Sequence, residues 1–299
     1  MTNSEKIRRK ALSLGFDLCG IARCRSLERQ YDRFKNWLAD GCDGGLEYLR
    51  RNTGKRFDPG ALCEGARSVI VCGVGYHRPP SAHEVASRIA SYAHSRDYHL
   101  TIRERLNELS AYLRELVPGA SGRVFTDTAP LAEKSWAVEA GLGWIGRNSL
   151  LANPRLGSFL LLGEVVTTAE LEPDAPFVRD GCGTCRACVD ACPVAAIRPD
   201  RTIDAGRCIS RRTIEAGDGD EGDLHGWLFG CDVCQRACPY NRKAPVSVHD
   251  SFAPLAELDR LDVDDWLGLD EAGFRRIFGE TPLARCGLRR LQERIRRLK

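Results

Sequence analysis

The sequence predicts an α+β protein built from three consecutive parts, and three observations support that prediction. Short apolar runs alternate with amphipathic stretches of helical period through residues 1–177, as in folds that combine helices with a sheet. Cysteines concentrate in residues 178–245, with a spacing typical of ligands rather than of packing. Apolar residues recur at helical spacing in residues 246–299, which predicts a helical tail.

Composition limits the class of protein. Of the 299 residues, 43% are hydrophobic and 28% are charged, which excludes disordered and fibrous proteins. The formal net charge is only +3, so binding of a polyanion has to depend on a local basic patch. No apolar run approaches the roughly 20 residues that a membrane span needs, and the first residues lack the layout of a secretory signal. We therefore expect a globular protein of the cytoplasm with no membrane contact.

Six segments of residues 1–177 have a clear helical or strand pattern. Ile7, Ala11 and Leu14 share one helical face, and Gly15 separates them from the first apolar run. Pro118 ends the longest helical pattern. The predicted elements are a helix around residues 7–14, a strand over 16–22, a helix over 27–38, a buried strand over 68–76, a helix over 97–116 and a strand over 157–168.

Residues 123–130 (RVFTDTAP) are predicted to form a strand that leads into a helix ending at Ala140. Asp127 lies at the turn between the strand and the helix. Asp127 or Thr128 can serve there simply as a helix cap, because Asp and Thr side chains accept hydrogen bonds from free helix N–H groups.

A glycine triplet, Gly141, Gly143 and Gly146, follows that helix. A dinucleotide-binding loop follows a strand instead, so the position of the triplet argues against such a loop. Three glycines in six residues predict that the backbone approaches a flat ligand closely.

The cysteines between residues 182 and 238 follow the spacing of iron–sulfur cluster ligands. The first run, C-x-x-C-x-x-C-x-x-x-C-P, is the bacterial ferredoxin pattern, in which the fourth cysteine binds a neighbouring cluster. The second run lacks its first cysteine, because Leu228 stands at that position, and Cys208 is the expected replacement. Crossed ligation of two [4Fe-4S] clusters then assigns Cys182, Cys185, Cys188 and Cys238 to one cluster and Cys192, Cys208, Cys231 and Cys234 to the other.

A pair of structural zinc sites is the alternative, since zinc also binds four cysteines in C-x-x-C knuckles. Zinc ribbons use two separated C-x-x-C pairs for each ion, whereas the four cysteines of this pattern bind two neighbouring clusters. Short helices are expected after Pro193 and Pro239. The other six cysteines have no ligand spacing and are predicted to be small buried or incidental thiols. They are Cys19, Cys24, Cys42, Cys63, Cys72 and Cys286.

The end of the tail is predicted to be a basic amphipathic helix. Its apolar stripe consists of Leu288, Leu291, Ile295 and Leu298. Arginines dominate the rest of residues 285–299, where Glu293 is the one acidic residue. Such a face can contact nucleic-acid phosphates or remain solvated. Residues 215–223 are predicted to form a solvated acidic turn.

Five segments resemble the epoxyqueuosine reductase family, whose members catalyse the last step of queuosine synthesis on tRNA. They are residues 92–99 (YAHSRDYH), 125–130 (FTDTAP), 140–146 (AGLGWIG), 208–215 (CISRRTIE) and 230–239 (GCDVCQRACP). The resemblance covers nearly the whole chain. It implies a cobalamin-binding α/β sandwich-type domain at residues 1–177, a ferredoxin-like domain with two [4Fe-4S] clusters at 178–245, and a helical tail at 246–299 that is truncated relative to many members.

The resemblance also implies roles for individual residues. Asp127 matches the family's proposed proton donor, and burial beside an apolar corrin face should raise its pKa so that it carries a proton at neutral pH. Ser91 stands where the family usually has Arg. The candidate contacts to a base-off cobalamin are Arg56, Tyr92, His99, Asp127 and Ser210. Arg56, Tyr92 and His99 are equally consistent with ordinary surface or packing roles.

The implied reaction is reductive removal of the epoxide oxygen of epoxyqueuosine at the wobble position of tRNA. Two alternatives remain, namely a corrinoid-dependent reductase of a small molecule, as the reductive dehalogenases are, and a plain two-cluster electron carrier. The first function is favoured because dehalogenases are typically exported and this sequence shows no export signal. The expected partners are the anticodon stem-loop of tRNA and an external low-potential electron donor, and the expected state is a monomer.

Overall fold

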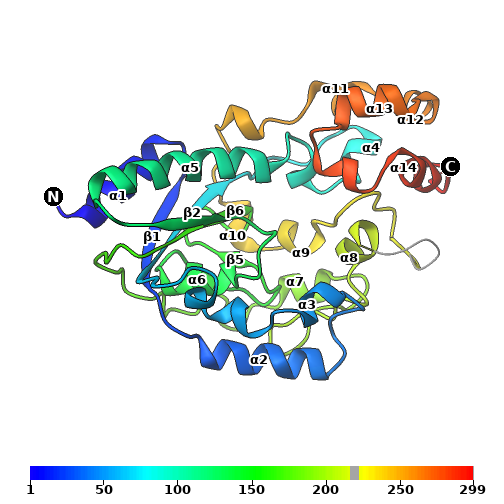
Figure 1. Ribbon diagram of the computed structural model, residues 1–299. Helices are drawn as coiled ribbons and strands as arrows, with labels where there is room; N and C mark the ends of the chain where they lie inside the picture. The colour runs from blue at the N-terminus through cyan, green and yellow to red at the C-terminus, as the bar shows by residue number, and fades with distance from the viewer. Residues whose placement is uncertain (216–221, 299) are drawn as a thin grey trace.

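A four-stranded sheet lies at the centre of the first part of the chain in the computed structural model, which describes residues 1–215 and 222–298 (Figure 1). Neighbouring strands are antiparallel, in the order β1-β2-β6-β3. The strands are β1 (Leu18–Arg23), β2 (Ser68–Gly75), β3 (Gly122–Phe125) and β6 (Leu160–Thr167), and a separate pair joins β4 (Trp144–Ile145) to β5 (Leu151–Ala152). The register places Val71 of β2 and Phe125 of β3 on either side of Glu164 in β6.

Burial explains why β2 is a central strand. All of its residues are buried, as expected for a run of β-branched and small residues without polar alternation. Successive side chains point to opposite faces, so Ile70 and Cys72 enter one apolar core while Val69 and Val71 enter the other.

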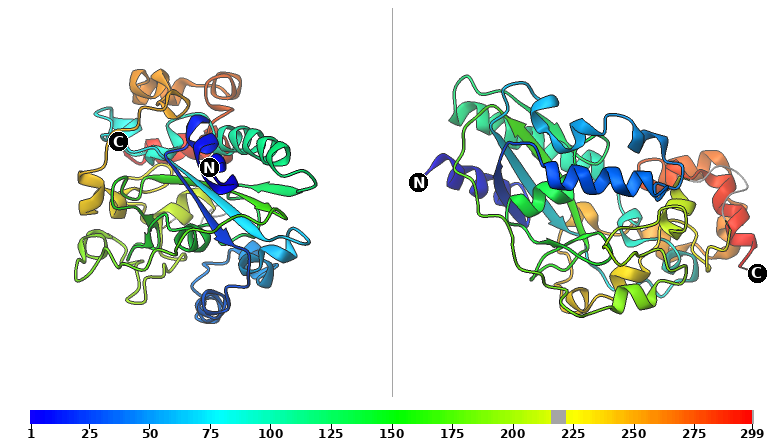
Figure 2. Two further views of the ribbon diagram at one scale, coloured as in Figure 1. Left: turned by 90° about the vertical axis from the view of Figure 1, so that its left-hand side faces the viewer. Right: turned by 90° about the horizontal axis from the view of Figure 1, so that it is seen from below.

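Helices cover both faces of this sheet, which makes the first part a three-layer sandwich (Figure 2). Helices α1 (Asn3–Ser13) and α5 (Tyr98–Leu116) pack on one face. Helix α6 (Glu133–Glu139) covers the other face through the fully buried Trp136, and α2 (Glu28–Ala39) packs at the edge of the same core.

The remaining helices are short and belong mostly to the second half of the chain. They are α3 (Glu47–Arg50), α4 (Glu84–Ser87), α7 (Ala187–Ala191), α8 (Ile209–Ile214), α9 (Val233–Arg236), α10 (Pro239–Arg242), α11 (Ala256–Arg260), α12 (Val263–Gly268), α13 (Glu271–Phe278) and α14 (Leu288–Arg296). Single 3-10 turns occupy Gly54–Phe57, Pro59–Ala61, Ser91–Ala93, Asp250–Phe252 and Pro282–Arg285.

A third apolar core joins residues from all three predicted parts. Ile89 lies beside Phe229 in an isolated parallel bridge, and the N–H of Ala90 donates to the carbonyl of Phe229 at 2.8 Å. Trp266 and Phe278 of the tail stack within this core at 4.7 Å between ring centroids. The tail is therefore packed against both preceding parts.

Each helix and strand predicted in the first part is present within a few residues of its predicted bounds, whereas two local predictions are wrong. No helix begins at Pro193 or directly after it, because Ala195 adopts a left-handed backbone with φ of 48°. Thr128 does not cap α6, which begins five residues later at Glu133 without a side-chain cap.

The predicted acidic turn at residues 215–223 lies largely outside the described residues. None of the described helices has the length and apolar character to cross a membrane.

Candidate functional site

The eight cysteines of the predicted cluster motifs lie in two groups of four. Burial raises the pKa of the Cys188 thiol, and the charges of Cys182, Cys238 and Cys185 raise it further. Burial likewise raises the pKa of Cys231 to about 12, with contributions from the charges of Cys208 and Cys192. Burial and the charges of Cys231 and Cys208 raise the pKa of Cys234 as well, with a smaller contribution from Cys188 of the first group. The structure thus brings together the two sets that crossed ligation requires, and their role as ligands stays a prediction.

Hydrogen-bond donors point at several of these sulfurs. Burial raises the pKa of Cys208, while the N–H groups of Arg211 and Ser210 at the start of α8 lower it. The indole Nε1–H of Trp144 lies 3.3 Å from the Sγ of Cys182. Donors of this kind tune the potential of iron–sulfur clusters. Among the residues that the structure describes, no three His, Cys, Asp or Glu side chains are arranged around a single metal ion.

A buried carboxylate connects the cysteine loop to the first part of the chain. Asp232 follows Cys231 directly and is 1% exposed. Its Oδ2 accepts hydrogen bonds from the N–H of Ser91 at 2.8 Å and from the Ser91 hydroxyl at 2.7 Å. The residue that replaces the family's usual Arg therefore anchors the segment that runs into α5.

Two aspartates flank His99 at the start of α5. Asp97 caps the helix by accepting the N–H of His99 at 3.0 Å, and its Oδ1 lies 2.5 Å from the imidazole Nδ1. The other ring nitrogen, Nε2, lies 3.2 Å from Oδ2 of Asp127. A guanidinium nitrogen of Arg285 lies 3.5 Å from the same Nε2. Helix α5, the turn after β3 and the tail thus meet at one imidazole.

The proton of this arrangement resides on His99 at neutral pH. Burial lowers the pKa of His99, but its hydrogen bonds to Asp127 and Asp97 outweigh burial and raise the pKa to about 9. The hydrogen bond from His99 lowers the pKa of Asp127 against the opposing effect of desolvation. The pKa of Asp127 within the protein itself is therefore lowered, because a side chain that is 52% exposed gains more from the imidazolium than it loses by burial. A rise of this pKa beside a corrin face stays a prediction.

The other candidate cobalamin contacts have different surroundings. Arg56 donates to the carbonyl of Tyr48 at 3.2 Å and lies over the ring of Tyr48. Tyr92 packs between Tyr98 and Phe229, with 6.2 Å between ring centroids in both cases, and its contact with cobalamin stays a prediction. Ser210 lies in the first turn of α8, and its side chain makes no hydrogen bond within residues 1–215 and 222–298.

Sequence analysis missed several charged residues around Asp127. Glu133 accepts the N–H of Asp127 through its Oε1. Lys134 is accessible to solvent and its charge lowers the pKa of Asp127. Arg285 arrives from the tail, and no sequence signal linked it to this site. Neither Asp127 nor Thr128 donates or accepts a hydrogen bond as a cap of α6, so the helix-cap alternative is wrong.

Two glycines of the triplet, Gly141 and Gly143, pack against protein backbone. A Cβ atom at Gly143 would lie 2.1 Å from the carbonyl oxygen of Ala152, and one at Gly141 would lie 2.7 Å from that of Ala175. At Gly141 and Gly143 the space beside the backbone is therefore filled by protein and not open to a flat ligand. A Cβ atom at Gly146 would instead meet the side chain of Asn148. Gly141 and Gly143 allow the loop after α6 to pack closely on β5 and on the segment before the first cysteine.

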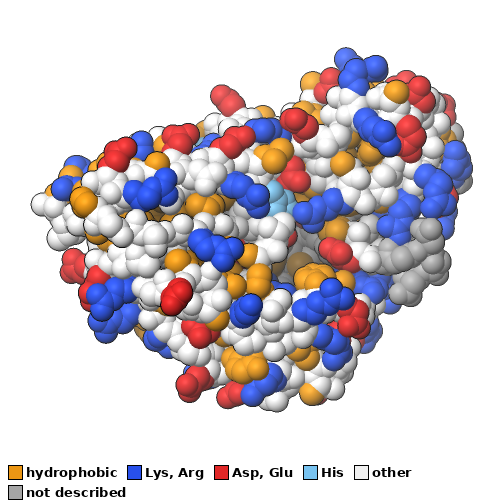
Figure 3. All heavy atoms as spheres, in the orientation of Figure 1, with side chains coloured by type: hydrophobic (Ala, Val, Ile, Leu, Met, Phe, Trp, Pro, Cys, Tyr) orange, Lys and Arg blue, Asp and Glu red, His pale blue; other side chains and the backbone are white. Residues whose placement is uncertain are grey.

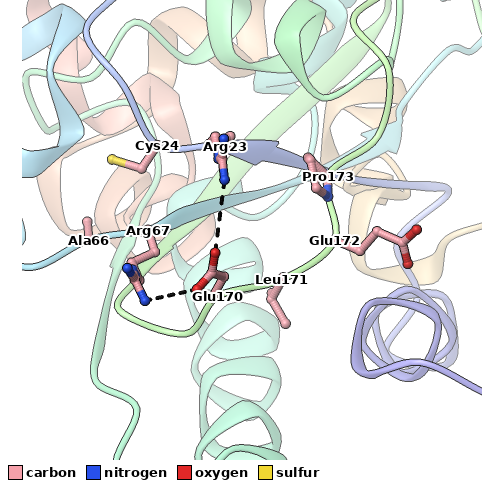
Figure 4. A pocket seen from close by; sticks show the side chains of 8 residues that line it. All are labelled: Arg23, Cys24, Ala66, Arg67, Glu170, Leu171, Glu172 and Pro173. Carbon is pink, nitrogen blue, oxygen red and sulfur yellow. Dashed lines mark hydrogen bonds and ion pairs between the residues drawn. The ribbon is translucent and has the colours of Figure 1, made fainter.

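The surface has a hollow between the tail helices and the part of the molecule below them, with a histidine side chain at its rim (Figure 3). A separate open cavity of about 440 Å³ lies where β1 ends. Glu170 pairs there with Arg23 and Arg67 (Figure 4). None of the candidate site residues lines this second cavity.

Helix α14 is held in place as its apolar stripe predicts. Leu288, Leu291 and Ile295 are buried in the third core. Arg294 is buried as well, and its guanidinium donates to the carbonyls of Thr213 at 3.0 Å and Leu228 at 2.6 Å. One arginine of the basic run therefore fixes the helix to the cysteine-rich part.

Two family models match parts of this chain. The model for epoxyqueuosine reductase QueG, DUF1730, matches residues 56–128, which include Arg56, His99 and Asp127. The model for a 4Fe-4S double cluster binding domain matches residues 181–241, which include all eight clustered cysteines.

Relatives and solved structures agree with these matches. An epoxyqueuosine reductase of Cyclobacterium marinum is 39% identical over 98% of this chain and 96% of its own length. The structure of an epoxyqueuosine reductase with an epoxyqueuosine-modified tRNA-Tyr stem loop superposes with a TM-score of 0.88 at 26% identity, over 97% of this chain and 79% of that chain. A Bacillus subtilis structure, with its catalytic aspartate loop swung out of the active site, gives a TM-score of 0.86 at 26% identity, over the same shares. By near-complete coverage at 39% identity, this chain belongs to the epoxyqueuosine reductase family.

Proposed function

We propose that this chain converts epoxyqueuosine to queuosine in the wobble position of tRNA. The reaction breaks both C–O bonds of the epoxide, forms a C=C bond and releases the oxygen as water, which requires two electrons and two protons. The observation that carries the proposal is the short link, through Ser91 and Asp232, between the cysteine loops and the proton-bearing group of Asp97, His99 and Asp127.

The cysteines are the proposed route for electrons. Cys182, Cys185, Cys188 and Cys238 would hold one [4Fe-4S] cluster, and Cys192, Cys208, Cys231 and Cys234 the other. The donor set fits, because eight thiols lie in two groups of four and backbone N–H groups point at Cys208 and Cys238. The ferredoxin-like part would pass electrons singly from an external low-potential donor to the reaction site.

The residues around Asp127 fit a base-off cobalamin. The Nε of Arg56 is buried without a hydrogen-bond partner in the described chain, and Tyr48 beside it is 52% exposed, so both can meet the amide groups of a corrin. Arg56, His99, Asp127 and Ser210 would hold the cofactor, with Tyr92 packed behind them. When bound, cobalamin supplies the low-potential cobalt centre that acts on the epoxide.

The proposed proton source is His99, and Asp127 delivers the proton. In the resting site His99 holds the proton and Asp127 is ionised. A departing epoxide oxygen is a stronger base than a carboxylate, so the proton on Nε2 of His99 passes to Asp127, 3.2 Å away, as Asp127 passes a proton to that oxygen, which leaves His99 neutral and Asp127 ionised again. Asp97 orients the imidazole and stabilises its positive charge. Solvent supplies the second proton.

The basic face of α14 is the proposed contact for the anticodon stem. Its arginines outside the buried Arg294 would meet phosphates while the target base enters the site. We further propose that the protein acts as a monomer in the cytoplasm, where its tRNA substrate is found. The division into residues 1–177, 178–245 and 246–299 belongs to this proposal.

Anaerobic turnover with three substrates tests the proposed function. The reconstituted protein, with excess dithionite as the reductant, is incubated with an epoxyqueuosine-modified anticodon stem-loop, with the free epoxyqueuosine nucleoside and with an organohalide. We expect conversion of the stem-loop to queuosine at the highest kcat/KM. Equal turnover of the free nucleoside would support a small-molecule reductase instead. Turnover of the organohalide alone would indicate a dehalogenase. If none of the three substrates is converted, the result would support a plain two-cluster electron carrier.

A further inference from the structure

A carboxyl group lies inside the sheet directly below the Asp127 turn. Glu164 is in the middle of β6, between Val71 and Phe125 of the neighbouring strands, and is 0% exposed. Among the described residues, no N–H or hydroxyl group donates to either of its carboxyl oxygens, and the group within hydrogen-bonding reach is the carboxyl of Glu133. Burial raises the pKa of Glu164 well above its ordinary value, and the charge of Glu133 adds to that rise. Burial in the sheet therefore favours the protonated form of Glu164 over the ionised one.

Glu133 lies between this buried acid and the Asp127 turn. Side chains at alternate positions of β6 face α6, so Glu164 points toward the helix whose first residue is Glu133. Burial also raises the pKa of Glu133, and the two carboxyl groups interact. Its Oε1 accepts the N–H of Asp127, and the charge of Lys134 lies nearby. Glu133 therefore joins the sheet interior to the backbone of Asp127.

The backbone of Asp127, which Glu133 contacts, has an unfavourable conformation. Asp127 has a φ of 53°, which a non-glycine residue adopts at a disadvantage of about 1 kcal/mol. Its neighbours add short turns, from Thr128 N–H to the Thr126 carbonyl and from Leu131 N–H to the Ala129 carbonyl, and the Thr126 hydroxyl donates to the Leu162 carbonyl of β6 at 3.1 Å. The side chain is 52% exposed, so packing contributes little to its position. In this conformation Oδ2 of Asp127 reaches His99.

We propose that Glu133 is the positioning residue for the Asp127 turn, and that the buried Glu164 holds Glu133 in place by sharing a proton with it. The inference rests on the proposed role of Asp127 in proton delivery. Glu133 does not touch the substrate; it acts by fixing the N–H of Asp127, and hence the direction of the carboxylate. Without this anchor the turn relaxes to an ordinary backbone and the carboxylate leaves His99.

Substitutions at Glu133 and Asp127 test the proposal in a double-mutant cycle. Glu133→Ala removes the acceptor, whereas Glu133→Gln keeps a carbonyl oxygen for the N–H of Asp127. We expect Glu133→Ala to lower kcat roughly 10- to 100-fold with KM unchanged. The Glu133→Gln variant should keep most of the wild-type kcat. Glu139→Ala at the other end of α6 is the matched control and should leave kcat unchanged. In the Asp127→Asn background, Glu133→Ala should have no further effect on kcat, because Glu133 acts only through Asp127.

Amide hydrogen exchange gives a readout that needs no turnover. The peptide that contains residues 126–131 should exchange faster in Glu133→Ala and in Glu164→Leu than in wild type, and Glu133→Gln should stay close to wild type. Unchanged exchange and unchanged kcat in Glu133→Ala would overturn the inference. So would a loss that is fully additive with Asp127→Asn, which would indicate general damage to the fold. Full activity of Asp127→Asn alone would instead reject the proposed function of Asp127, so the two failures are distinguishable.

Discussion

The substitution Asp97→Asn tests whether the His99 proton depends on its carboxylate partners. Asn caps a helix as well as Asp does, and its amide oxygen can still accept from Nδ1, so the change removes mainly a negative charge that lies 2.5 Å from the imidazole. The pKa of His99 rises from 6.5 to about 9, which corresponds to about 3 kcal/mol in favour of the charged ring. The carboxylates of Asp97 and Asp127 both contribute to this rise in the pKa of His99. Loss of the Asp97 charge should therefore lower the pKa of His99 by about one pH unit.

The sign of the pH dependence follows from the raised pKa. His99 keeps its proton below about pH 9 and loses it above, so turnover should fall along an alkaline limb near pH 9 in wild type and about one pH unit lower in Asp97→Asn. The stabilisation that His99 gives to the fold should be complete below about pH 6.5 and disappear as the pH rises through about 9.

The assay is kcat for the modified stem-loop between pH 6 and 10, with iron content measured at each pH. Asp270→Asn makes the same substitution at the cap of α13, far from His99 in sequence, and serves as the control. Identical alkaline limbs in wild type and Asp97→Asn would refute the assignment of the proton to His99.

Three further substitutions have distinct expected outcomes. Asp127→Asn should reduce turnover by about 100-fold or more while iron and cobalamin content stay unchanged, and full activity would contradict its role in proton delivery. Cys208→Ser should lose one cluster, or about four of eight iron atoms, whereas Cys63→Ser in the sheet core should lose none; retention of both clusters in Cys208→Ser would refute the ligand assignment. Charge reversal to Glu on α14 should weaken tRNA binding and flatten its salt dependence without changing iron content, and unchanged turnover at near-physiological salt would exclude the helix as a tRNA contact. The reversed residues are Arg289, Arg290, Arg296 and Arg297.

Features that depend on local spacing were predictable from the sequence. The two groups of cysteines follow from a short repeated pattern, and Cys208 follows from the gap at Leu228. The helices and strands of the first part follow from apolar periodicity, because each has one or two faces in a core. Pro193 does not start the helix that its position predicts, since Ala195 turns the chain in the left-handed region.

Features that depend on long-range charge pairing were not predictable. The protonation state of Asp127 is decided by His99, which lies 3.2 Å away but in a different element, and by Arg285 of the tail. Desolvation alone suggested the opposite direction for its pKa. Glu164 did leave a signal, because a glutamate in the middle of the strand LLLGEVVT is unusual for a fully buried strand, and a buried carboxyl group requires a partner.

Cofactor dependence of nucleoside conversion is the most direct test of the proposed function. Protein with reconstituted clusters is incubated under anaerobic conditions with dithionite and the epoxyqueuosine-modified stem-loop, with and without added cobalamin, and the digested nucleosides are analysed by mass spectrometry. We predict that queuosine appears only when both the clusters and cobalamin are present, and that about eight iron atoms accompany each active chain. Conversion without cobalamin, or no conversion by fully loaded protein, would contradict the proposal.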